Sequence, residues 1–211
     1  NHIGYVTNGV HLPTWTDRNW QRLYSEVFGE NYIDNQSDPA VWEKIKDVKD
    51  EVIWGIRKKL KHNLIEFLKV KIAEDMQNRS ESPRLILDTI ENLNENALII
   101  GFARRFATYK RAHLLFTNIE RLSKIVNDVN RPVIFLFAGK AHPNDKAGQD
   151  LIKNIIEVAR RKDFVGKVLF VNNYDMEIGK LLTSSVDVWM NTPTRPLEAS
   201  GTSGEKAVMN G

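Results

Sequence analysis

The stretch Ala97-Leu98-Ile99-Ile100-Gly101-Phe102 decides the fold class, because it carries no polar side chain on either face of an extended strand. Two similar runs follow at 133–139 (Val-Ile-Phe-Leu-Phe-Ala-Gly) and 168–171 (Val-Leu-Phe-Val), and 186–190 (Val-Asp-Val-Trp-Met) supplies a fourth strand. Apolar spacing predicts intervening helices over 109–126, 145–161 and 176–182. Strands that alternate with helices form right-handed βαβ units, so the sequence predicts an α/β protein with a doubly wound, Rossmann-like parallel sheet.

The chain before this region follows a different pattern. From Arg18 to Lys71 apolar residues recur near helical spacing, so we expect a mostly helical section that ends at about residue 95. Asp38-Pro39 predicts a helix start, with Asp as the cap and Pro at the first helical position. The charged stretch from Glu74 to Pro83 predicts a loop. The four tryptophans Trp15, Trp20, Trp42 and Trp54 are interpreted as packing residues rather than as sugar-stacking platforms.

Composition excludes several classes of function. The 211 residues carry a net charge of only +3, without a long basic run, so we expect no nucleic-acid partner. No stretch approaches the length of an apolar membrane span, and we expect no membrane and a cytoplasmic location. Cysteine is absent, and neither His11 nor His113 has a second ligand at metal spacing, so we expect no metal site.

The segment Glu198-Ala-Ser-Gly-Thr-Ser-Gly-Glu-Lys206 places a carboxylate, a turn of small residues and a lysine within nine positions. Its glycines allow backbone amides to approach an anion closely. If a helix starts near Gly204, Lys206 lies in its first turn, where it can pair with a phosphate or attack an aldehyde cofactor. The segment does not match the nucleotide P-loop, which argues against ATP chemistry. An ordinary loop-to-helix junction remains open at this point.

A basic cluster follows the first strand of the sheet. Arg104, Arg105, Lys110 and Arg111 flank the strand end, and Thr108 is a plausible cap for the next helix. An Arg fork and a Lys point charge can together hold inorganic phosphate, although a solvated charged turn has the same composition. The cluster, the Asn173-Tyr174 pair and Glu198 to Gly204 all follow strands, so we expect them at one edge of the sheet. Lys140 also follows a strand, but for this residue we favour a role other than binding a ligand.

Three segments of the chain resemble the α-glucan (glycogen, starch, maltodextrin) phosphorylases. Glu198 to Lys206 looks like the family's pyridoxal phosphate segment, and residues 101–111 (Gly-Phe-Ala-Arg-Arg-Phe-Ala-Thr-Tyr-Lys-Arg) resemble its basic phosphate-binding segment. Residues 6–15 (Val-Thr-Asn-Gly-Val-His-Leu-Pro-Thr-Trp) resemble its Thr-Asn-Gly segment. The segments occur in family order, and the likeness is best to the bacterial and archaeal branch.

The resemblance implies the C-terminal half of a two-domain glycosyltransferase fold (GT-B) and an internal fragment of a longer, cytoplasmic enzyme. Residues 1–17 would be a crossover segment with a sugar-contact motif, 18–95 a helical lead-in, and 96–211 a Rossmann-like domain truncated at its C-terminus. Expected partners are an α-1,4-glucan or maltodextrin, inorganic phosphate and glucose 1-phosphate, with a second copy of the parent protein as a further option. The fragment on its own is expected to be inactive.

The resemblance also implies roles for individual residues. The cofactor pyridoxal 5'-phosphate would be bound by Lys206, Arg104, Tyr174, Gly201 and Thr202. The glucosyl unit would be contacted by Asn8, Tyr109, Glu198, Ser200 and Gly201. Arg105 and Lys110 would hold the substrate phosphate and, with Lys206, carry the catalytic chemistry. The glucosyl unit would pass to phosphate with retention, while the cofactor phosphate relays a proton.

The chain departs from the animal and plant enzymes at three positions. Ala107 stands where they have His, Asp175 where they have Arg, and Arg104 where they have Lys, so their regulation is not carried over. Two alternatives stay open: a nucleotide-sugar-dependent glucosyltransferase of the glycogen synthase type, and a glucan-binding module without catalysis.

Overall fold

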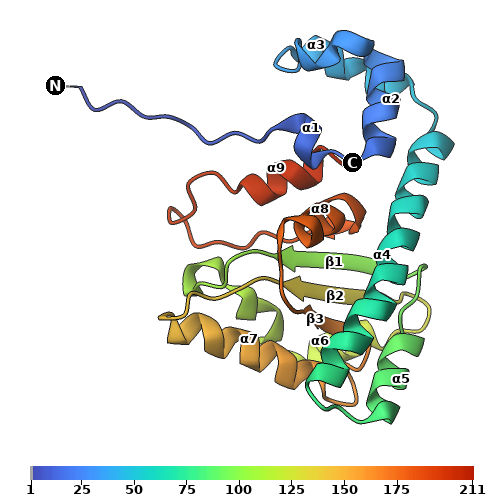
Figure 1. The fold of residues 1–211 in the computed structure, drawn as a ribbon, viewed down its shortest axis with the longest axis vertical. Coiled ribbons are helices and arrows are strands. Elements are labelled where there is room, and N and C mark those ends of the chain that lie inside the picture. The colour runs from blue at the N-terminus through green and yellow to red at the C-terminus, as the bar shows by residue number, and fades with distance from the viewer. Residues whose placement is uncertain (1) are drawn as a thin grey trace.

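The predicted parallel sheet is present in the computed structural model, which describes residues 2–211 (Figure 1). Its strands are β1 (Leu98–Ala103), β2 (Val133–Ala138), β3 (Val168–Val171) and β4 (Val188–Trp189). They lie in the order β3-β2-β1-β4, and every neighbouring pair is parallel. This is the order of the first four strands of a Rossmann fold, so the predicted fold class is confirmed. The fourth strand is shorter than the predicted 186–190.

Helices occupy most of the remaining chain. The α-helices are α1 (Leu12–Trp15), α2 (Arg18–Phe28), α3 (Pro39–Glu43), α4 (Asp50–Asn78), α5 (Pro83–Glu91), α6 (Ile119–Val126), α7 (Lys146–Ala159), α8 (Met176–Ser185) and α9 (Thr202–Val208). The 3₁₀ helices are η1 (Glu30–Ile33), η2 (Lys44–Asp47), η3 (Thr108–Lys110) and η4 (Ala112–Phe116). Among the described residues, no helix combines the length and the apolar character that a membrane span requires.

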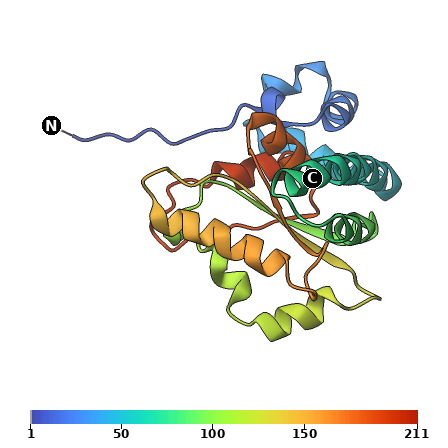
Figure 2. The same cartoon turned by 60° about the horizontal axis from the view of Figure 1, so that its bottom comes forward.

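Strand alternation divides the core between the two faces of the sheet. Ile99 and Ala103 of β1 pack in one cluster with α4, α5 and α8, whereas Phe102 points to the opposite face and packs with α6 and α7. Figures 1 and 2 show the same division, with α8 and α4 on one side of the sheet and α6 and α7 on the other. Helices therefore cover both faces, as the continuous apolar strands predict.

A third cluster lies beyond the sheet, around the start of α4. Tyr24, Phe28, Tyr32 and Trp42 pack ring against ring, with centroid separations of 5.1–6.4 Å. Trp20 is buried in the same cluster, so the packing interpretation is confirmed for Trp20 and Trp42. Trp54 is 55% exposed, and for this residue the interpretation is wrong. Asp38 accepts a hydrogen bond from the Ala40 amide and caps α3, as predicted.

The expectation of one helix over 109–126 is wrong. Two 3₁₀ turns occupy this stretch, separated by Arg111 in a left-handed conformation (φ 53°, ψ 41°), and α6 begins only at Ile119, capped by Asn118. The Thr108 side chain caps no helix. The physical reason is tertiary, because the Thr194 amide donates to the Tyr109 carbonyl and the Thr192 hydroxyl donates to that of Lys110.

Two further boundaries differ from the sequence expectations. The predicted loop over 74–83 is mostly helical, since α4 continues to Asn78 and leaves only residues 79–82 as the link to α5. The C-terminal helix begins at Thr202 rather than near Gly204, after Gly201 in a left-handed conformation. Lys206 is therefore the fifth helical residue and lies beyond the first turn.

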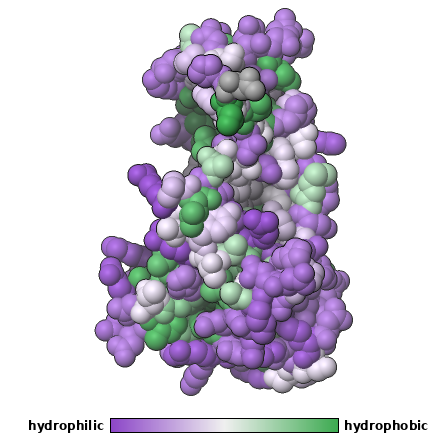
Figure 3. Space-filling view, turned by 90° about the vertical axis from the view of Figure 1, so that its left-hand side faces the viewer, coloured by the Kyte–Doolittle hydropathy of each residue, from purple (hydrophilic) through white to green (hydrophobic). Residues whose placement is uncertain are grey.

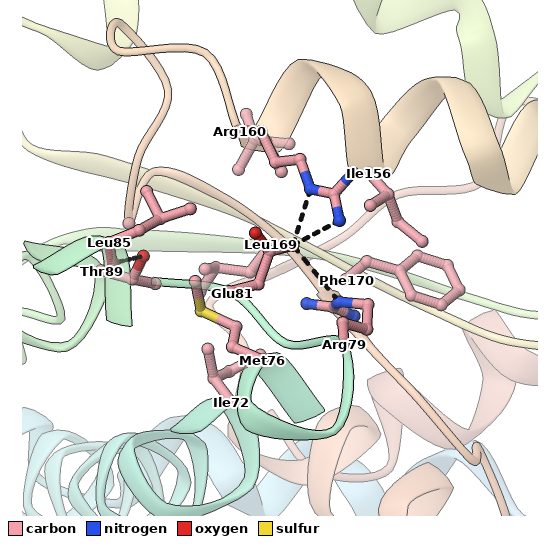
Figure 4. A pocket seen from close by; sticks show the side chains of 13 residues that line it. Ile72, Met76, Arg79, Glu81, Leu85, Thr89, Ile156, Arg160, Leu169 and Phe170 are labelled. Atoms are coloured by element: carbon pink, nitrogen blue, oxygen red, sulfur yellow. Dashed lines mark hydrogen bonds and ion pairs between the residues drawn. The ribbon is translucent and has the colours of Figure 1, made fainter. Parts of the chain in front are cut away.

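The link between α4 and α5 covers a small cavity beside the edge strand β3 (Figure 4). Its floor is apolar, with Ile72, Met76 and Phe170 among the lining side chains. At its mouth the Glu81 carboxylate accepts hydrogen bonds from the Arg160 guanidinium, and its Oε1 lies 3.8 Å from Arg79 Nε. None of the site residues expected from the sequence lines this cavity. The ion pairs of Glu81 with Arg160 and Arg79 therefore hold the α4–α5 link against the end of α7.

Replacing Glu81 by glutamine is expected to lower the free energy of unfolding by about 1–2 kcal/mol. The change removes the carboxylate that the two guanidinium groups share and leaves them to repel each other, in a place where the Glu81 side chain is only 13% exposed. Urea unfolding measures the effect. Glu43→Gln is the matched control, because Glu43 pairs with Lys46 on an open surface and such pairs contribute little. Equal losses in both variants would contradict this role of Glu81.

Candidate functional site

The segment that follows β1 is fixed tightly against the segment that follows β2. The Arg104 amide donates to the Ala138 carbonyl at 3.2 Å, and the Phe106 amide donates to the Lys140 carbonyl at 2.9 Å. A Cβ placed on Gly139 would lie only 2.0 Å from the Arg104 oxygen, and Gly139 has φ 143°. Only glycine meets both conditions. Arg104 is thereby held at the carboxyl end of the sheet, the side seen in Figure 3, where hydrophobic side chains lie scattered among hydrophilic ones.

Glu198 joins the basic cluster to the loop that follows β4. Arg104 Nη2 donates to Glu198 Oε1 at 2.7 Å, and Lys110 Nζ donates to Oε2 at 2.8 Å. Arg104 and Lys110 are each only 7% exposed. Burial acts to raise the pKa of Glu198, but the hydrogen bonds and charges of Lys110 and Arg104 outweigh it, so the pKa is lowered. The carboxylate is therefore ionised and bound to two buried cations.

The other members of the basic cluster have different environments. Arg105, unlike Arg104, is exposed. Arg111 donates from Nε to the Thr192 carbonyl at 2.7 Å and from Nη2 to the Pro193 carbonyl, which anchors the loop after β4. The Tyr109 ring lies under Lys110, with Nζ 4.9 Å from its centroid. Arg111 thus anchors a loop, whereas the other three cations of the cluster are available to bind a ligand. These are Arg104, Arg105 and Lys110.

The Arg104 guanidinium has capacity left for an anion. Its Nη2 binds Glu198, while Nε and Nη1 are buried without a hydrogen-bond partner in the described part of the chain. Buried donors are normally paired, and leaving one unpaired costs about 1–3 kcal/mol. A phosphate bound beside Arg104 would supply the missing acceptors after a small shift of the side chain.

The turn before α9 lies next to Glu198. Gly201 has φ 71° and ψ 41°, and a Cβ placed on it would lie 4.0 Å from Glu198 Cγ. A cavity of about 260 Å³ opens here. It is lined by Asn191, Pro193, Thr194, Arg195, Pro196, Glu198, Ser200 and Gly201. The expected sugar-contact residues Glu198, Ser200 and Gly201 therefore share one hollow, while Thr202 begins α9 directly beside it.

Lys206 occupies a second, adjoining part of the site. Its Nζ lies 3.4 Å from the centroid of the Trp15 ring. Burial lowers the pKa of the Lys206 amine from 10.5, and the charge of Glu205 opposes the shift only in part. Trp15 was interpreted from the sequence as a packing residue, and its contact with Lys206 was missed. The available signal was that Trp15 closes the Thr-Asn-Gly segment.

Tyr174 completes this part of the site. A Cβ placed on Gly179 would lie 2.8 Å from Tyr174 Oη and 3.7 Å from Trp15 Cζ3, so both side chains border this glycine. Burial raises the pKa of Tyr174, with a smaller contribution from Asp175. Trp15 thus lies against the Lys206 amine, and both Trp15 and Tyr174 border Gly179.

Several residues considered for the site from the sequence do not lie with Glu198 and Lys206 in the structure. Asn8 lies in an exposed, extended N-terminal segment that projects away from the rest of the chain (Figure 1). Lys140 lines a different cavity of about 430 Å³, together with Asn172 and Asn173. Among the described residues, neither His11 nor His113 belongs to a group of three potential metal ligands.

Comparisons with known proteins show which family this chain is similar to. The model of the carbohydrate phosphorylase family matches residues 1–211. A glycogen phosphorylase of Aquifex aeolicus is 44% identical over 211 residues, which is 100% of this chain and 30% of that protein. A maltodextrin phosphorylase of Thermococcus litoralis is 44% identical over 206 residues, 98% of this chain and 24% of that protein. A glycogen phosphorylase of Mycobacterium bovis is 38% identical over 209 residues, 99% of this chain and 24% of that protein. The chain thus spans less than a third of the length of these relatives.

Proposed function

Because the chain belongs to the carbohydrate phosphorylase family, we propose that it supplies the cofactor lysine and the phosphate-binding cations of an α-1,4-glucan phosphorylase. The observation that carries the proposal is the meeting of three distant segments at one edge of the sheet. Arg104 and Lys110 bind Glu198, Gly201 adjoins Glu198, and the helix begun at this turn carries Lys206 to Trp15. The family match favours this reaction over nucleotide-sugar transfer.

The residues present fit pyridoxal phosphate as the cofactor. Lys206 offers an amine whose pKa burial lowers, Trp15 offers an aromatic face beside it, and Arg104 has buried donors without partners in the described part of the chain. Tyr174, which borders the same glycine as Trp15, is proposed to lie near the cofactor ring. Gly201 and Thr202 would add backbone amides toward the cofactor phosphate. When bound, the cofactor supplies a phosphate group that can give and take a proton.

In the proposed reaction the residues of this chain bind and orient the reactants. Arg105 and Lys110 hold inorganic phosphate by charge-assisted hydrogen bonds. Glu198, Ser200, Gly201 and Tyr109 contact the glucosyl hydroxyls. A role for Asn8 stays a proposal from the resemblance, because its exposed segment lies away from these residues. The bond between the anomeric carbon and the glucan oxygen breaks, and that oxygen takes the proton of the inorganic phosphate. A phosphate oxygen then bonds the same face of the sugar, which gives glucose 1-phosphate and a shortened glucan. The buried cations stabilise the negative charge that faces the developing oxocarbenium ion.

Borohydride reduction of the whole protein after incubation with pyridoxal phosphate tests the proposal. A pyridoxyl group on Lys206, found by peptide mass mapping, together with formation of glucose 1-phosphate from maltodextrin and phosphate, would support it. An unmodified Lys206 in a folded protein would overturn it. Release of glucosyl units only from a nucleotide sugar would replace it by the glucosyltransferase alternative. Glucan binding without turnover by the cofactor-loaded protein would favour the other alternative, a glucan-binding module without catalysis.

Replacing Arg105 by methionine is expected to raise the phosphate concentration at half-maximal rate by about tenfold to a hundredfold, the effect of one charge-assisted contact. Arg105 is exposed, so the unfolding midpoint should stay unchanged. Initial-rate kinetics with varied phosphate measure the effect. Arg121→Met, on the outer side of α6, is the matched control and should leave the kinetics unaltered. An unchanged phosphate dependence for Arg105→Met would remove this residue from the phosphate site.

A further inference from the structure

Asn210 is a polar side chain that is almost completely buried, with 1% exposure. It follows α9 by two residues, and its carboxamide makes three hydrogen bonds. Oδ1 accepts from the Asp17 amide at 2.7 Å, while Nδ2 donates to the Trp15 carbonyl at 2.9 Å and to the Lys206 carbonyl at 2.8 Å. One side chain therefore connects the backbone of Lys206 to the backbone of the residue whose ring covers the Lys206 amine.

The connection matters because α9 contains little that fixes it by itself; it packs against α8, and its C-terminal turn is bound by Tyr24 and Arg57. The helix has only seven residues, and its N-cap Gly201 offers no side chain to bind the first amides. Helices this short are not stable without tertiary contacts. The helix that ends at Trp15 is shorter still, since α1 has four residues. Two small elements that are almost two hundred residues apart in the sequence are joined by this carboxamide in addition to the Lys206–Trp15 contact.

We propose that Asn210 is a positioning residue that holds Lys206 on Trp15 and so presents its amine to the cofactor. Its importance for catalysis rests on the proposed function of Lys206, whereas the positioning itself does not. The chemistry is specific to an amide. An aspartate of the same shape keeps the acceptor for Asp17 but turns oxygen toward two carbonyl oxygens, and both bonds are lost.

A purely structural role is the competing explanation, and a neighbouring hydrogen bond provides its control. Tyr24 Oη donates to the Met209 carbonyl at 2.9 Å, next to Asn210 in the chain. Tyr24→Phe removes this bond and weakens the same C-terminal turn, yet leaves all three carboxamide bonds intact. Lys110 is an internal control, because its side chain is only 8% exposed and lies at the other part of the site.

The experiment compares the whole protein, free of cofactor, as wild type, Asn210→Asp and Tyr24→Phe. Acetic anhydride is applied briefly, and the acetylation rates of Lys206 and Lys110 are read by peptide mass mapping. For Asn210→Asp we expect Lys206 to react about tenfold faster with Lys110 unchanged, because losing two bonds makes local opening that much more frequent. Borohydride-trapped pyridoxal phosphate on Lys206 at low cofactor concentration should fall by about the same factor.

Three outcomes would overturn the inference. These are an unchanged Lys206 rate, an equal rise at Lys110, and the same change in Tyr24→Phe. If Asn210→Asp does not fold, Asn210→Ser, which keeps one donor and one acceptor, is read in the same way. If wild-type Lys206 takes up no pyridoxal phosphate, the proposed function fails, while the acetylation rates still decide whether Asn210 positions Lys206.

Discussion

Replacing Lys206 by arginine is expected to abolish covalent attachment of pyridoxal phosphate and to lower phosphorolysis by about a thousandfold or more. Arginine keeps a positive charge and can stack on the Trp15 ring, so the fold and the cation–π contact should survive. Its guanidinium stays protonated and cannot attack an aldehyde. Borohydride trapping with mass mapping measures attachment, and glucose 1-phosphate formation measures the reaction.

The pH dependence of attachment provides a second readout of Lys206. Only the neutral amine is nucleophilic, and burial lowers its pKa from the ordinary 10.5. Attachment in the wild type should therefore rise with pH and reach half of its maximum below 10.5, earlier than for an exposed lysine. Lys180→Arg is the matched control, because Lys180 and Trp15 line one hollow and Lys180 pairs with Glu177. Attachment that persists in Lys206→Arg, or is lost in Lys180→Arg, would contradict the assignment.

The sequence was sufficient for the sheet but not for the turns that shape the site. Strands such as Leu98–Ala103 are apolar on both faces, and this local property already requires burial between two layers of helices. The stretch 109–116 has helical spacing, but the carbonyls of Tyr109 and Lys110 accept hydrogen bonds from Thr194 and Thr192, which lie more than eighty positions away. Local periodicity contains no information about such partners.

The start of α9 shows the same limit. Gly201 and Gly204 both permit a helix start, and the sequence alone favoured the second. In the structure Gly201 takes the left-handed conformation, while Gly204 lies within the helix, where a Cβ would come 2.9 Å from Asn191 Nδ2. Gly204 thus lets the Asn191 side chain approach the helix closely, and Gly201 allows the left-handed turn from which α9 begins. The resemblance pointed to Lys206 as a candidate, which stays a prediction, but its contacts with Trp15 and Asn210 required the tertiary structure.

Replacing Arg57 by methionine is expected to lower the free energy of unfolding by about 3–5 kcal/mol. Arg57 is buried on α4, and its guanidinium donates to the Ser184 and Val186 carbonyls, both at 2.6 Å. Longer bonds reach the carbonyls of Ser185 and Asn210, both at 3.3 Å. These carbonyls end α8 and close the C-terminal turn, and methionine would fill the space of the stem but leave them without donors. Thermal and urea unfolding measure the loss.

The loss of stability in Arg57→Met also depends on whether the Asp187 carboxylate keeps a partner when the guanidinium is removed. The nearest Arg57–Asp187 distance is 3.9 Å, but Asp187 also pairs with Lys61 Nζ at 2.7 Å and accepts from the Ile99 amide at 2.8 Å. Its charge stays compensated, so the loss comes from the orphaned carbonyls rather than from a bare carboxylate. Lys58→Met, the exposed neighbour on α4, is the control and should change stability by less than about 0.5 kcal/mol. A loss below about 1 kcal/mol for Arg57→Met would mean that water replaces the guanidinium at these carbonyls. The C-terminal turn that carries Asn210 would then depend on the Asn210 carboxamide and on the Tyr24 hydroxyl, which donates to the Met209 carbonyl.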